Sequence, residues 1–184
     1  MKAAADLKFT FKQEQQSLEY DPKKGPLTYL GVSVQAWANG RPLIREGTNA
    51  HFDLAALLSH GLRGGQIHLY NCSCGVPYCL QVQEPAHQIV QGENLYWRFS
   101  ADHYQNLLNP EVFENSSFLT LSLRKEQVHY ALTQAVQYLE ELENSAGLRV
   151  VVQPDKGWPN QGLSVEQVLR QAWRKHSKQK PSAT

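Results

Sequence analysis

The dipeptide Asn39-Gly40 restricts the possible folds more than any other feature of the sequence. Both residues tolerate positive φ, and such a pair between two alternating segments is typical of a two-residue β-hairpin loop. In segment 28–38, apolar residues recur at every second position, which predicts a strand with a buried face. That face carries Val32, Val34 and Ala36, and the opposite face carries Tyr29 and Trp37. Segment 41–45 is the predicted return strand.

Further segments show the same period of two. Segments 87–90 and 95–99 flank Gln91-Gly92-Glu93-Asn94 and predict a second hairpin. Leu95, Trp97 and Phe99 share one face there, so we expect them in the core. Additional strands are expected at 7–11, 66–72, 118–123 and 148–152. We expect residues 66–99 to form one structural unit of strand, bend and hairpin.

Helical periodicity appears in three places. Segment 126–143 repeats apolar residues at helical spacing, and Gly147 ends it. A short helix is expected between Asp53 as N-cap and Gly61, and a last helix from Ser164, which forms a capping box with Gln167. Hairpins with intervening helices predict an α+β fold, with a mainly antiparallel sheet and two or three helices packed on one face. We expect one domain over residues 1–176 and a flexible basic tail over 177–184.

Length and composition suit a globular chain. A chain of 184 residues can bury enough apolar surface to fold without disulfides. The longest purely apolar run is Leu54 to Leu58, too short to span a membrane, and the first residues show no apolar region of a secretory signal. These features predict a cytoplasmic protein that does not act at a membrane.

The charge is unevenly distributed. Thirteen basic and 17 acidic residues precede residue 170, a formal charge of −4, whereas Arg170, Arg174, Lys175, Lys178 and Lys180 follow without an acid. An acidic body is not typical of a nucleic-acid-binding domain, although Arg170, Arg174 and Lys178 have the spacing to contact phosphates. A frayed basic tail is the preferred interpretation, so nucleic acid is not the expected partner.

Three cysteines, Cys72, Cys74 and Cys79, are confined to one short segment. An odd number of clustered cysteines argues against a disulfide framework. One interpretation is a zinc site, structural or hydrolytic, in which His68 or His87 supplies the fourth ligand. His68 is considered because it shares strand parity with Cys72. The preferred interpretation is that the cysteines pack as small buried residues and hold no metal, because the second ligand pair usual in structural zinc sites is missing. Redox and catalytic roles are weaker alternatives.

The cysteine segment also carries a family resemblance. Gly65-Gln66-Ile67-His68-Leu69-Tyr70-Asn71 leads into Cys-x-Cys-Gly and a third cysteine, and a hairpin ending in Tyr96-Trp97-Arg98-Phe99 follows. This stretch of about 40 residues resembles a group of small bacterial proteins of uncharacterised function. Those proteins have Gly before the last cysteine, where this chain has Tyr78, so the turn here must differ. The resemblance implies a shared element of fold and no particular activity.

No motif of the sequence supplies a nucleophile, a base and an electrophile together, so we expect no catalytic residues and a non-enzymatic function. Asp102-His103 is interpreted as a turn or helix cap. The expected function is a small bacterial protein-binding module, in the specific form of an immunity protein that neutralises a cognate toxin. The expected partner-binding residues are Trp158, in a loop, and Glu140, Glu141 and Glu143, at a helix C-terminus where the dipole disfavours them. A plain solvated face is the alternative for the three glutamates.

Overall fold

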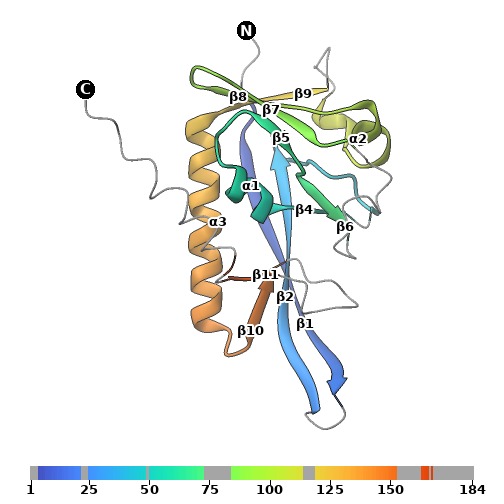
Figure 1. Cartoon of the computed structure of the whole chain (residues 1–184), viewed down its shortest axis with the longest axis vertical. Coiled ribbons are helices and arrows are strands. Elements are labelled where there is room, and N and C mark those ends of the chain that lie inside the picture. Colours follow the sequence, from blue (N-terminus) through green and yellow to red (C-terminus); the bar gives the residue numbers. More distant parts are fainter. Residues whose placement is uncertain are drawn as a thin grey trace, which may run out of the picture.

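The computed structural model describes residues 4–21, 25–48, 50–72, 84–113, 119–152, 163–165 and 167. Among them, three sheets and three α-helices form an α+β fold in which most strand pairs are antiparallel (Figure 1). The longest strands are β1 (Leu7–Asp21) and β2 (Gly25–Ala38), which pair as an antiparallel ribbon. The ribbon extends beyond the end of the long helix at the bottom of Figure 1. The predicted α+β class is confirmed.

The Asn39-Gly40 turn is confirmed, since both residues have positive φ, 53° and 75°. The return strand β3 (Arg41–Pro42) is much shorter than expected. After it the chain continues towards another partner, because Ile44 forms a β-bridge with Leu108. The first strand is instead longer than the apolar alternation of 7–11 suggested, because β2 offers it a ladder along nearly its whole length.

The β1–β2 sheet is extended by β10 (Arg149–Val152), which pairs with β2 in parallel, and then by β11 (Leu163–Ser164), which pairs with β10 in antiparallel orientation. One face of this sheet is apolar. Across the ribbon, Leu7 pairs with Ala38, Phe9 with Ala36 and Phe11 with Val34. Large residues on β1 therefore lie opposite small ones on β2, which leaves room on this face for other elements to pack.

A second sheet joins β5 (Gly65–Ile67), β7 (Ala86–Gln91), β8 (Asn94–Arg98) and β9 (Thr120–Arg124), all antiparallel. The predicted hairpin around 91–94 is its β7–β8 pair. Leu95, Trp97 and Phe99 are buried, as expected for the core face of this hairpin.

The expected strand 66–72 is wrong as a single element. It divides into β5 and β6 (Tyr70–Cys72), and β6 pairs with β4 (Ala50–Phe52) in a separate two-stranded sheet. The chain turns at His68-Leu69, where the Leu69 carbonyl accepts a hydrogen bond from the Asp53 backbone N–H at 2.7 Å. Residues 66–99 are therefore not one structural unit in the expected sense: β5, β7 and β8 share a sheet, whereas β6 belongs to another. Residues 73–83 lie outside the described part of the chain.

Three α-helices complete the described fold: α1 (Leu54–His60), α2 (Ala101–Asn106) and α3 (Lys125–Ser145), with a 3-10 turn at Pro110–Val112. As predicted, Asp53 caps α1 through its side chain and Gly61 ends it. The helix α3 runs beside β1, where Phe11 stacks on Tyr138 with ring centroids 4.3 Å apart. Its predicted apolar stripe faces inward, with Val128, Leu132, Ala135 and Leu139 buried.

Phe52 lies where the three sheets meet. Its ring centroid is 5.3 Å from that of Phe9 on β1, 6.0 Å from Tyr70 on β6 and 6.0 Å from Trp97 on β8. One continuous hydrophobic cluster therefore includes residues from every sheet and from α3. At the C-terminal side, Val165 is buried, and the predicted capping box is formed: Gln167 N–H donates to Ser164 Oγ and Ser164 N–H to Gln167 Oε1. The remainder of the predicted last helix and the tail lie outside the described residues.

Candidate functional site

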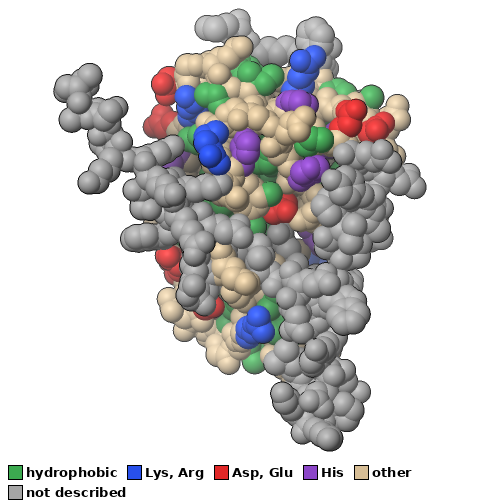
Figure 2. Space-filling model, in the orientation of Figure 1, with side chains coloured by type: hydrophobic (Ala, Val, Ile, Leu, Met, Phe, Trp, Pro, Cys, Tyr) green, Lys and Arg blue, Asp and Glu red, His purple; other side chains and the backbone are tan. Residues whose placement is uncertain are grey.

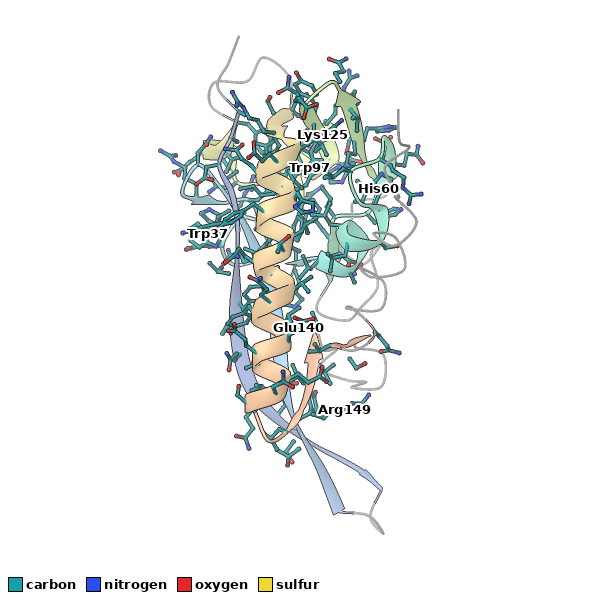
Figure 3. The ribbon with its side chains drawn as sticks, turned by 90° about the vertical axis from the view of Figure 1, so that its left-hand side faces the viewer. Trp37, His60, Trp97, Lys125, Glu140 and Arg149 are labelled. Atoms are coloured by element: carbon teal, nitrogen blue, oxygen red, sulfur yellow. The ribbon has the colours of Figure 1, made fainter. Side chains whose placement is uncertain are left out.

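The outer face of α3 is the first candidate for a binding surface. The helix buries one stripe against the core and turns the opposite stripe outward, as its spacing predicted. Tyr130 lies on the outward stripe with 66% of its surface exposed, and it is the one large hydrophobic residue that is exposed in the described part of the chain. Glu140, Glu141 and Glu143 are all exposed as well. Figure 3 shows this helix in front of the sheets, with Glu140 in its lower half.

The charged residues of α3 are mostly acidic. The helix carries Lys125 against Glu126, Glu140, Glu141 and Glu143, a formal charge of −3, and its last turn holds no basic residue. Acidic side chains near a helix C-terminus are disfavoured by the helix dipole, because the terminal carbonyls already carry partial negative charge. Acidic side chains are visible along the left edge of the molecule, where α3 runs (Figure 2). A surface of this sign attracts basic partners over a Debye length.

The cysteine segment begins at the end of β6. Cys72 pairs in register with Ala50 of β4, whereas Cys74 and Cys79 lie outside the described residues. His68 and His87 are both exposed, His68 in the link between β5 and β6 and His87 on β7 opposite Gln66. The expected strand parity between His68 and Cys72 is wrong, because the strand is interrupted between them. Within the described ranges, no three His, Cys, Asp or Glu side chains gather as metal ligands would.

Of the predicted Asp102-His103 cap, His103 takes part in the capping box of α2, and Asp102 lies in the first turn of the helix. Ser100 is the N-cap of α2, and its hydroxyl lies 2.8 Å from His103 Nδ1, which also accepts from the Ser100 N–H at 3.3 Å. His103 is almost fully buried, against Tyr70 and Phe99. This burial lowers the pKa of His103 to about 4, an effect that the nearby Asp102 carboxylate opposes. The ring is therefore neutral at pH 7, and its contacts with Ser100 give it a structural role at the start of α2.

Asp53 is another residue with a perturbed pKa. Burial raises the pKa of Asp53, and hydrogen bonds from the Ala56 N–H and the Asn71 side chain oppose that rise. Since the same carboxylate caps α1 and holds β6, it fixes the position at which the chain leaves β5 for β6. Trp158, the remaining predicted partner-binding residue, lies outside the described residues.

Sequence reasoning missed a polar cleft on the face of β1–β2 opposite α3. The cleft has a volume of about 370 Å³ and lies between the ribbon and residues 44–48 and 50–51. Lys12, Glu14, Gly31, Ser33 and Arg45 are among its lining residues. A glycine inside an otherwise alternating strand often marks a close approach by another group, so Gly31 was the signal in the sequence that could have indicated it.

Comparisons with protein-family models, with curated proteins and with solved structures found no match for this chain. In the described residues, no helix is both long enough and apolar enough to cross a membrane. The geometry of the molecule itself therefore carries the functional argument.

Proposed function

We propose that the chain is a protein-binding module that docks a basic partner surface against the outer face of α3. The observation that carries this proposal is the exposed Tyr130 ring on the same helix as four exposed or partly exposed acidic positions. Tyrosine is enriched among the residues that dominate binding energy, because its rigid ring buries a large area at a low cost in conformational entropy.

Acidic residues around such an anchor contribute orientation and speed of association more than affinity. Glu140, Glu141 and Glu143 lie on the last two turns of α3, whereas Tyr130 lies in the second turn. At 1.5 Å per residue, Tyr130 and Glu140 are about 15 Å apart along the helix axis. This distance fits within one side of a standard protein interface.

The specific form that we propose is a small cytoplasmic bacterial immunity protein, which binds and blocks a cognate toxin. A toxin that acts on nucleic acid needs a basic surface to hold phosphates, and an acidic helix is complementary to that surface. Neutralisation of this kind requires no catalytic residues in the neutralising chain.

The test uses the protein encoded beside this chain as the defined partner, with affinity measured by titration calorimetry. Tyr130→Ala should weaken binding by about 2 kcal/mol or more, as expected for a central aromatic anchor. Tyr138→Phe is the control, because Tyr138 lies on the inner side of α3, stacked on Phe11. Equal affinity of Tyr130→Ala and the unchanged chain would refute the α3 surface. No binding by the neighbouring protein would refute the immunity form.

A further inference from the structure

The polar cleft on the outer face of the β1–β2 ribbon is a second, independent candidate site. Residues Thr10, Lys12, Glu14 and Gln16 alternate with the core-facing positions of β1 and therefore lie on the opposite face. They pair in register with Gln35, Ser33, Gly31 and Tyr29 of β2. Residues 44–48 and 50–51 form the second wall. Because α3 packs on the other face of β1, a partner on α3 would leave this cleft accessible.

Hydrogen bonds to neighbouring side chains on the same face hold the two ends of the cleft in place. The Trp37 Nε1–H donates to Thr10 Oγ1 at 2.7 Å, and the Tyr29 hydroxyl donates to Gln16 Oε1 at 2.6 Å. Each bond uses an acceptor on the cleft residue and leaves a donor, the Thr10 hydroxyl proton and the Gln16 amide N–H groups. In Figure 3, Trp37 lies at the left of the ribbon and α3 at its right, in agreement with opposite faces.

Gly31 lies in the middle of the floor. It is buried, it lines the cleft, and it is the register partner of Glu14. Glu14 therefore has no side chain opposite it on β2. A glycine at such a position allows another backbone to approach the sheet closely.

Each wall of the cleft carries one basic and one acidic residue. Lys12 and Glu14 stand on the β1 side, and Arg45 and Glu46 on the facing wall, so the formal charges cancel. Arg45 is directed in part by the Leu108 carbonyl, which accepts from its Nε–H at 3.3 Å. Lys12 and Glu14 are two residues apart on one strand, about 6.8 Å by the strand rise. An extended peptide repeats its own side chains at the same interval.

We propose that this cleft binds an extended polar peptide segment that carries one acidic and one basic side chain two residues apart. The acidic side chain pairs with Lys12, and the basic side chain pairs with Glu14, both of which are exposed. The cleft runs from Thr10 to Gln16, about 20 Å by the strand rise, which suits an extended chain of about six residues better than a compact small molecule. The donors at Thr10 and Gln16 are available to carbonyl groups near its two ends.

The test measures fluorescence anisotropy of labelled six-residue peptides on the full chain. The probe peptide is Gly-Glu-Ser-Lys-Gly-Gly with blocked ends, and the comparison peptides carry Glu-Lys at adjacent positions or Gln in place of both charges. The probe, whose charges are two residues apart, should bind at least about fivefold more tightly than either comparison peptide. The proposal would be overturned if the three peptides bound equally or if the probe did not bind. It would also be overturned if free glutamate and lysine displaced the probe as well as the unlabelled peptide does.

Matched variants locate the site. Lys12→Glu should weaken binding of the probe by about tenfold, whereas Lys8→Glu, on the same face of β1 but outside the cleft, should change it by less than about twofold. Glu14→Lys should also weaken binding of the probe by about tenfold, because it removes the partner of the basic side chain. If Lys8→Glu weakened binding as much as Lys12→Glu, the interaction would be a general charge effect and the assignment would be wrong.

Discussion

Gln88 and Trp97 form a buried polar pair whose removal should be costly. Gln88 is 2% exposed and Trp97 is fully buried. The Trp97 Nε1–H donates to Gln88 Oε1 at 2.8 Å, and Gln88 Nε2 donates to the carbonyls of Gly61 and Arg63 at 2.8 and 2.6 Å. The amide therefore uses one acceptor and both donor hydrogens, and it joins the β7–β8 hairpin to the loop after α1.

Gln88→Met keeps the side-chain volume and removes all three bonds. The carbonyls of Gly61 and Arg63 lie near the surface and can regain water, whereas the indole N–H cannot, because Trp97 is fully buried. A stranded buried donor costs about 1–3 kcal/mol, and the two lost bonds at the loop add about 1 kcal/mol. The free energy of unfolding should therefore fall by about 2–4 kcal/mol, measured by urea denaturation followed by circular dichroism, at an unchanged m value.

A double-mutant cycle separates this pair from simple packing loss. Trp97→Phe removes the donor and leaves Gln88 Oε1 without its partner, so it is destabilising by itself. The double variant lacks both the Trp97 N–H and the Gln88 carbonyl oxygen, so neither is left buried without its partner. Its loss in free energy of unfolding should therefore be smaller than the sum of the two single losses by about 1–2 kcal/mol. Additive losses, or a loss below about 0.5 kcal/mol for Gln88→Met, would refute the reasoning.

Three further predictions concern other parts of the chain. Burial lowers the pKa of His103 from 6.5 to about 4, so the unfolded chain binds the proton more strongly and the free energy of unfolding should fall as the pH drops from about 6.5 towards 4. His103→Gln, which preserves a capping side chain, should flatten this part of a pH series of urea denaturation curves. An unchanged slope in this variant would contradict the assignment to His103. Trp173→Ala should lower the free energy of unfolding by roughly 3 kcal/mol or more. A chain that ends at residue 176 should have the melting temperature of the full chain, whereas a chain that ends at residue 163 should melt at a lower temperature. Equal melting temperatures for the two shortened chains would show that the last helix is not part of the core. The purified chain should carry no zinc by native mass spectrometry, and one equivalent of zinc lost on Cys74→Ser would reverse the preference for packed cysteines over a zinc site.

The elements set by local residues could be predicted from the sequence. Asn39-Gly40 demands a tight turn whatever surrounds it, the Asp53 and Gly61 caps delimit α1, and the apolar spacing of α3 requires one buried face. The class of fold followed from these elements, since hairpins and amphipathic helices can bury their apolar faces only against one another.

The features set by distant contacts could not be predicted. The split of 66–72 depends on Asp53, whose backbone N–H takes the Leu69 carbonyl and whose carboxylate accepts from the Asn71 side chain. The parallel pair between β10 and β2 joins segments more than a hundred residues apart, and no local pattern encodes it. For the same reason the cleft was missed: Lys12 and Arg45 line one cleft only because residues 44–48 and 50–51 lie beside this face of β1–β2.

The most direct test of the proposed function is the association rate of the partner encoded beside this chain, measured by stopped flow at several salt concentrations. Electrostatic steering by α3 predicts that Glu140→Gln/Glu141→Gln slows association by at least about threefold at low salt and makes the rate less sensitive to salt. Glu46→Gln/Glu84→Gln, which changes the net charge equally at exposed positions outside α3, should leave both nearly unchanged. Equal rates and equal salt dependence for the two double variants would contradict an α3 docking surface.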